Sequence, residues 1–95
     1  MSQPVLEPSA LKSSTGSRRW MVVIFNNETN SFDEVISVLM EATGCGIEEA
    51  AIEAWEAHTY GKAPVHFADR QTCTNAAALI STIGVKTEVA PEWDD

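Results

Sequence analysis

The sequence predicts a small α+β domain in which a three-stranded antiparallel sheet packs against three helices, in the order β-α-α-β-α-β, behind a disordered N-terminal tail. Three observations predict this fold. The chain has 95 residues, enough for one core and too few for two. Apolar residues recur with a helical period in three segments. Three other segments are short and either continuously apolar or alternating, which is typical of strands.

The chain divides near residue 19. Residues 1–18 contain two prolines, five serines and only scattered apolar side chains, too little apolar surface to offset the entropy of ordering. We therefore predict a flexible N-terminal tail over residues 1–18 and a folded core domain over residues 19–95. The core begins with the run 20–25 (WMVVIF), which predicts a strand buried on both faces.

A polar loop over residues 26–30 separates this strand from the first helix. Ser31 and Glu34 have the spacing of a capping box, so the helix is expected to begin there. Its apolar positions form one stripe that faces a core: Phe32, Val35, Ile36, Leu39 and Met40. The segment Gly44-Cys45-Gly46 is expected to end it.

The second half of the chain continues with two helices and two strands. A helix from Ile47 should end at Gly61, with an apolar stripe made of Ile47, Ala50, Ala51, Ala54, Trp55 and His58. A short strand follows over 63–68, and Pro64 favours an edge position for it. Asp69 caps a third helix that stops at Gly84. The alternating segment 85–89 predicts the last strand, which Pro91 ends.

Composition and charge exclude several classes of protein. No apolar run approaches the roughly 18 residues of a membrane span, so no membrane association is expected. Residues 20–95 carry 13 acidic side chains against three basic ones, and such a surface repels nucleic acid. Cys45 and Cys73 lie 28 positions apart without a CxxC motif, so neither a disulfide framework nor a metal site is expected. We expect a cytoplasmic monomer without cofactor.

Few residues are candidates for chemistry. Cys73 lies in the middle of a helical apolar stripe, where a buried structural thiol is the ordinary interpretation. His58 and His66 do not have the helical spacing of metal ligands, and His66 receives no role. His58 and the loop 26–30 together could form a site. The alternative is that His58 is a satisfied core histidine and the asparagines only form a turn.

Three stretches carry a family resemblance. Residues 22–32 (VVIFNNETNSF), 35–39 (VISVL) and 57–63 (AHTYGKA) resemble, in order and at the expected spacing, the ClpS family of protease adaptors. The similarity covers about residues 19–92. It implies a protein that is not an enzyme, that binds N-degron substrates with bulky hydrophobic N-terminal residues, and that docks on the N-domain of a Clp AAA+ unfoldase. It also implies that the N-terminal extension serves delivery rather than binding.

The resemblance also implies individual roles. The residues implied to bind the N-terminal amine are Asn26, Asn27, Glu28 and His58. Those implied to surround the side-chain pocket are Asn30, Phe32, Val35, Val38, Ala54 and Ala57. The chemistry fits, because an ammonium group has three donors and one charge and needs converging acceptors.

Two departures from the common family pattern bear on function. Asn27 replaces the usual aspartate, which removes a carboxylate from the amine site, and Glu28 is a possible substitute for it. Phe32 and Ala54 both occupy positions where methionine is usual, as in a divergent branch of the family, and this pair should reshape the pocket. The expected function is therefore an N-degron adaptor. The alternatives are a ClpS-like domain that has lost amine recognition and either binds another protein segment or regulates the unfoldase, and a metal-free hydrolase.

Overall fold

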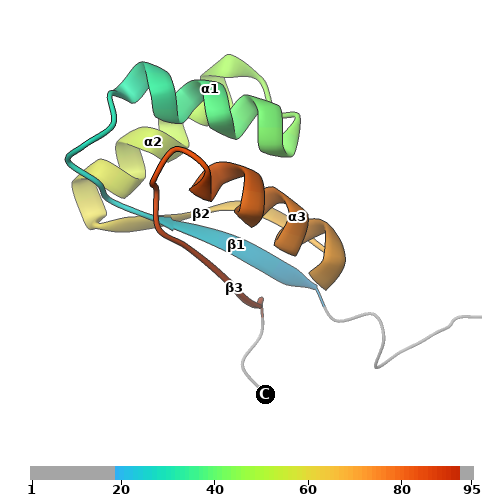
Figure 1. The fold of residues 1–95 in the computed structure, drawn as a ribbon. Helices are drawn as coiled ribbons and strands as arrows, with labels where there is room; N and C mark the ends of the chain where they lie inside the picture. Colours follow the sequence, from blue (N-terminus) through green and yellow to red (C-terminus); the bar gives the residue numbers. More distant parts are fainter. Residues whose placement is uncertain (1–18, 93–95) are drawn as a thin grey trace, which may run out of the picture.

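The computed structural model describes residues 19–92, and its elements follow the predicted order (Figure 1). They are β1 (Trp20–Phe25), α1 (Phe32–Thr43), α2 (Ile47–Tyr60), β2 (Lys62–Ala68), α3 (Arg70–Ser81) and β3 (Thr87–Pro91). The predicted α+β fold, with three helices and three antiparallel strands, is confirmed. The predicted tail, residues 1–18, lies outside the described residues. Within the described range, no helix has the length and apolarity that a membrane span requires.

The sheet is built around β1, the most apolar strand. The strand order is β2-β1-β3, and β1 pairs antiparallel with both neighbours. Val22, Val23 and Ile24 are all buried, as a continuous apolar run in a central strand should be. β2 is an edge strand, as Pro64 indicated. Its pairing with β1 shifts register between Val22 and Val23, a bulge beside this proline, which has no N–H to donate.

The predicted capping box at the start of α1 is present. The Ser31 hydroxyl accepts a hydrogen bond from the Glu34 backbone N–H at 3.1 Å, and the Glu34 carboxylate accepts one from the Ser31 N–H at 2.9 Å. The Ser31 bond and a second one from Asn30 lower the pKa of Glu34, which keeps the cap ionised. Gly44 ends α1 in the left-handed region at φ 76°, which glycine adopts without strain.

The helices form layers over one face of the sheet (Figure 1). α2 packs mainly on β2, α3 packs on β1 and β3, and α1 packs on both other helices. The buried cluster between them consists of Val22, Ile24, Val38, Leu39, Ala50, Ala57, Ala63, Val65, Cys73, Ala76, Ala77, Ile80 and Val85. Many of its members on α2 and α3 are alanines, so these helices approach their neighbours closely.

The predicted inner face of α2 was wrong in part. Ile47 and Trp55 are 62% and 51% exposed, and His58 is exposed as well, although all three belong to the predicted stripe. The buried side chains of this helix are Ala50, Glu53, Ala54 and Ala57. The helix therefore packs on α1 and β2 through three alanines and Glu53, and Trp55 lies at the surface.

The last strand also differs from the prediction. β3 spans Thr87–Pro91 rather than 85–89, and Pro91 pairs with Trp20 instead of ending the strand before it. A proline is tolerated there because β3 is an edge strand and Pro91 is its last residue. α3 ends at Ser81, and a turn over residues 82–84 leads to the buried Val85.

Glu53 is the buried charged residue of α2 and carries a prediction about stability. Its burial, with the charge of Glu49 and then of Glu56, raises its pKa from 4.5 to about 7. The neutral carboxyl is thus favoured in the folded state, so its contribution to stability is complete below pH 4.5 and is lost as the pH rises through 7. Glu53→Gln should raise the free energy of unfolding by about 1 to 2 kcal/mol at pH 8.5. This is less than the full pKa shift would correspond to, because solvent partly screens the carboxylate.

The measurement is urea unfolding of both proteins at pH 5 and pH 8.5. The gain from Glu53→Gln should shrink at pH 5, where the wild-type carboxyl is already neutral. Equal stability of the two proteins at pH 8.5 would show that the carboxylate is solvated well enough to ionise without cost.

Candidate functional site

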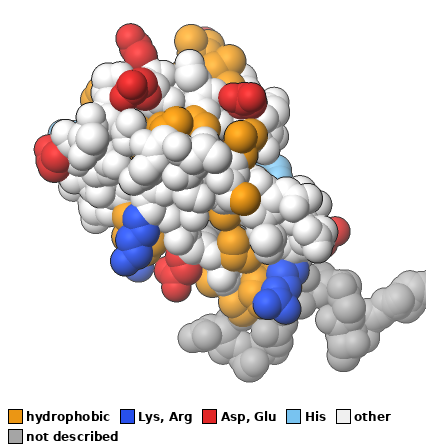
Figure 2. Space-filling model, viewed as in Figure 1, with side chains coloured by type: hydrophobic (Ala, Val, Ile, Leu, Met, Phe, Trp, Pro, Cys, Tyr) orange, Lys and Arg blue, Asp and Glu red, His pale blue; other side chains and the backbone are white. Residues whose placement is uncertain are grey.

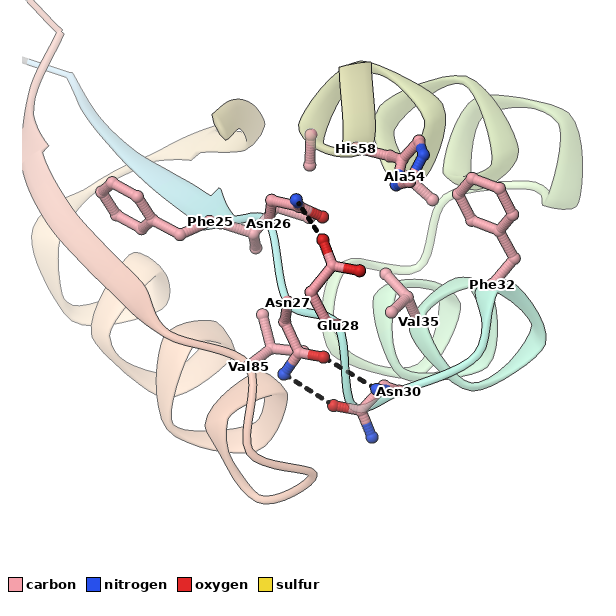
Figure 3. Close-up of a pocket in the computed structure, with 12 residues that line it drawn as sticks. Phe25, Asn26, Asn27, Glu28, Asn30, Phe32, Val35, Ala54, His58 and Val85 are labelled. Carbon is pink, nitrogen blue, oxygen red and sulfur yellow. Dashed lines mark hydrogen bonds between the residues drawn. The ribbon is translucent and has the colours of Figure 1, made fainter. Parts of the chain in front are cut away.

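A cavity of about 170 Å³ opens where β1 ends and the polar loop 26–30 begins (Figure 3). β1, α1, α2 and the turn before β3 all contribute to its walls. The lining residues are Ile24, Phe25, Asn26, Asn27, Glu28, Asn30, Phe32, Val35, Ala54, Ala57, His58 and Val85. The cavity is therefore polar on the side of the loop and apolar on the side of the two helices.

Backbone pairing brings the loop to the end of α2. The last residue of β1, Phe25, pairs with Lys62 at the start of β2, directly after α2 ends. The Asn26 N–H then donates to the Gly61 carbonyl at 2.8 Å. Because Gly61 lies three residues after His58, this pairing places the imidazole beside the loop. The predicted association of the loop with His58 therefore follows from the sheet.

Asn27 holds the loop in shape. Its Oδ1 accepts hydrogen bonds from the backbone N–H groups of Thr29, at 2.8 Å, and Asn30, at 2.7 Å. Its Nδ2 donates to Asn30 Oδ1 at 2.9 Å and to the Gly84 carbonyl at 3.2 Å. Both lone pairs of the amide oxygen are thus used within the protein. This side chain ties the loop to the turn before β3.

The polar end of the cavity is formed by three side chains that face one another: Asn26, Glu28 and His58 (Figure 3). Asn26 Nδ2 donates to Glu28 Oε2 at 3.2 Å, which directs the amide and the carboxylate to the same place. Asn26 Oδ1, the Glu28 carboxylate and an imidazole nitrogen are all acceptors. Glu28 carries the negative charge among the residues that line the cavity.

The apolar side comes from both helices. Ala54 and Ala57 are buried on α2, and Val35 of α1 is half-buried opposite them. Phe32 stands at the rim, 48% exposed, with its ring edge-on to His58 at 5.6 Å between ring centroids. An alanine at position 54 leaves open space beside this aromatic rim.

Nearly all of the residues predicted from the resemblance lie around this cavity. Val38 does not: its side chain belongs to the buried cluster behind the wall. The sequence analysis did not single out Ile24, Phe25 or Val85. The first two follow from the cavity lying at the end of β1. Nothing in the local sequence marks Val85, which reaches the site through the turn after α3.

The groups around the cavity can bind a donor-rich cation and an apolar side chain together. The Cys73 thiol lies elsewhere, fully buried in α3, and this burial raises its pKa, as for a structural thiol. Among residues 19–92, no three His, Cys, Asp or Glu side chains are placed to hold a metal ion. The geometry thus favours recognition of a ligand that presents an ammonium group next to a hydrophobic group.

The fold is shared with a protein of known structure. A solved structure of Agrobacterium tumefaciens ClpS2 bound to L-phenylalaninamide matches with a TM-score of 0.73 and 18% sequence identity. The match covers 79% of this chain and 98% of that one, and at this identity it shows a shared fold. No curated protein matches the sequence significantly. The family model described as ATP-dependent Clp protease adaptor protein ClpS matches residues 15–89, so the chain belongs to the ClpS family of Clp protease adaptors, which is not a catalytic family.

Proposed function

We propose that this protein binds the free N-terminal residue of N-degron substrates, prefers bulky hydrophobic residues, and delivers the substrates to a Clp AAA+ unfoldase without any catalysis of its own. The observation that carries the proposal is the convergence of Asn26, Glu28 and His58 at one end of an apolar cavity. The delivery step and the docking on the N-domain of the unfoldase are supported by family membership.

The polar end suits an α-ammonium group. Such a group has three N–H donors and a positive charge, and the three side chains offer one acceptor each. The Glu28 carboxylate adds the charge complement, since hydrogen bonds between ionised partners are roughly twice as strong as neutral ones. An acetylated terminus lacks the charge and two of the donors, and its acetyl group would occupy the space beside Asn26.

The apolar walls suit the first side chain of the substrate. Val35, Ala54 and Ala57 offer a hydrophobic surface, and Phe32 can cover the entering group from the rim. Burying a Leu or Phe side chain there should contribute about 1.5 to 3 kcal/mol. The Agrobacterium tumefaciens structure supports this assignment, because L-phenylalaninamide combines a free α-amine with an aromatic side chain.

The replacement of aspartate by Asn27 changes how the amine is held. In this chain the Asn27 amide is hydrogen-bonded within the loop 26–30 and to the turn before β3, whereas the Glu28 carboxylate lines the cavity. We assign the charged contact to Glu28 and a positioning role to Asn27. Loss of amine recognition, the alternative function, would require that Glu28 cannot serve in this way.

A binding screen tests the proposed specificity. Peptides that differ only in the first residue are titrated against the full chain and followed by fluorescence anisotropy. Peptides beginning with Leu, Phe, Tyr or Trp should bind about 10- to 100-fold more tightly than those beginning with Ser or Gly, because the apolar contact is lost in the latter. Affinity that does not depend on the first residue would refute the side-chain pocket.

A further inference from the structure

A second pocket, of about 360 Å³, lies at the other end of β1 from the first one. It is formed where the α1–α2 connection and the first half of α2 face β2. Its lining residues are Arg19, Thr43, Gly44, Cys45, Glu49, Glu53, Val65, His66 and Phe67, none of which lines the first cavity. Its volume falls within the range of small-ligand sites in proteins.

The notable wall residue is Glu53. Its side chain is only 9% exposed, and its Oε1 is buried without any hydrogen-bond partner. Buried carboxylate oxygens in proteins are nearly always paired, since an unpaired one costs the desolvation of that atom. Glu53 Oε1 is therefore an acceptor without a donor on the wall of an open pocket.

The charges around Glu53 do not satisfy it. Glu49 and Glu56, on the same helix, add negative charge beside it, and the one side-chain hydrogen bond of Glu53 is shared with the acid Glu49. The guanidinium of Arg19 faces the pocket but is engaged elsewhere: its Nε pairs with Glu92 at 3.2 Å, and the group lies 5.3 Å from the Phe67 ring centroid. His66 on β2 and Cys45 in the α1–α2 connection are the other titratable groups that face the pocket. The pocket is thus left with a carboxyl group that has no basic partner for its charge when it ionises.

We propose that this pocket binds a cationic nitrogen group, the guanidinium or ammonium of a basic side chain, with Glu53 as its anionic partner and Glu49 as a second acidic contact. An organic cation fits better than a metal ion, because within residues 19–92 no cluster of three metal-ligating side chains exists. Thr43 and the backbone of the α1–α2 connection supply further acceptors for N–H groups.

Proton and cation compete for Glu53. Its pKa of about 7 means that the free pocket is largely neutral at pH 6 and largely ionised at pH 8. A cationic ligand requires the ionised form, so its affinity should fall about tenfold from pH 8 to pH 6.

The probe is Nα-acetyl-L-arginine amide, which has no free α-amine and therefore cannot use the amine site of the first cavity. It is titrated into the 15N-labelled full chain at pH 8 and followed by amide chemical shifts. Saturable shifts centred on Thr43, Cys45 and Val65 are expected. The neutral isostere Nα-acetyl-L-citrulline amide should bind at least about tenfold more weakly, since it lacks the charge.

Two variants make the assignment specific. Glu53→Gln should abolish saturable binding of the arginine probe, whereas Glu48→Gln, an exposed change on the same helix outside the pocket, should leave it within about twofold. Both variants change the net charge equally. Absence of saturable shifts in the wild type at pH 8, equal binding of arginine and citrulline probes, or unchanged binding in Glu53→Gln would each overturn the proposal.

The cation has two possible sources, this chain's own Lys12 and Arg18 or a separate protein. Replacing both by glutamine in the full chain distinguishes them. Tighter binding of the probe to this variant assigns the pocket to the chain's own basic residues, and unchanged binding assigns it to another protein. Either result supports the cation site.

Discussion

Replacing Glu28 by glutamine is expected to weaken the binding of a peptide with a free N-terminal Phe by about 10- to 100-fold at pH 7.5, because a hydrogen bond to a charged group contributes about 1.5 to 3 kcal/mol. Glu28 Oε2 accepts the Asn26 amide at 3.2 Å at the polar end of the cavity. Glutamine keeps the shape of this side chain and removes its charge. Isothermal titration calorimetry with the same peptide measures the change.

Glu41→Gln is the matched control. Glu41 is exposed on α1 and does not line the cavity, so this variant changes the net charge by the same amount without touching the site. Its affinity should stay within about twofold of the wild type. Equal affinities of Glu28→Gln and Glu41→Gln would remove Glu28 from the amine site.

Asn27→Ala is expected to lower the free energy of unfolding by about 2 kcal/mol or more. Each of the four hydrogen bonds of Asn27 contributes roughly 0.5 to 1.5 kcal/mol, and water partly replaces the bonds that the variant loses. The bonds are those to Thr29 N, Asn30 N, Asn30 Oδ1 and the Gly84 carbonyl. Peptide affinity should also fall, because the loop that carries Glu28 loses its tie to the turn before β3. Urea unfolding and the same calorimetric titration provide the two readouts.

Asn27→Asp distinguishes the hydrogen bonds that the Asn27 side chain accepts from those that it donates. Aspartate keeps the oxygen that accepts from the backbone N–H groups of Thr29 and Asn30 but cannot donate to Asn30 Oδ1 or to the Gly84 carbonyl. Its loss of stability should be smaller than that of alanine, because two of the four bonds remain. A loss below about 0.5 kcal/mol for Asn27→Ala would mean that water replaces all four bonds and that the loop holds its shape by other means.

Local signals predicted the fold well where they act within a single element. The capping box of Ser31 and Glu34, the apolar run of β1 and the edge position of β2 were all confirmed. The errors arose where tertiary packing determines which face of a helix is buried. The alanines of α2 allowed Glu53 to turn inward and Trp55 outward, and a hydrophobic stripe cannot indicate such a rotation.

The residues that line the first cavity could be predicted from the family motifs but not from periodicity. The pairing of Phe25 with Lys62 and the bond from Asn26 to Gly61 bring the loop to His58, and neither contact has a local signature. The four hydrogen bonds of the Asn27 amide likewise form only in the folded loop. Its partner Gly84 lies 57 positions away. The cation site proposed in the second pocket rests on the buried Glu53 Oε1, which has no hydrogen-bond partner, and no sequence pattern predicts such an atom.

The amine site should distinguish a free amino terminus from a blocked one. Two peptides beginning with Phe, identical except that one is acetylated at its N-terminus, are titrated into the full chain by calorimetry at pH 7.5. The free peptide should bind saturably, and the acetylated one should bind at least about 100-fold more weakly, because Asn26, Glu28 and His58 would be left without the charge and the donors that they accept. Equal affinity of the two peptides would contradict the claim and leave the cavity without an amine site.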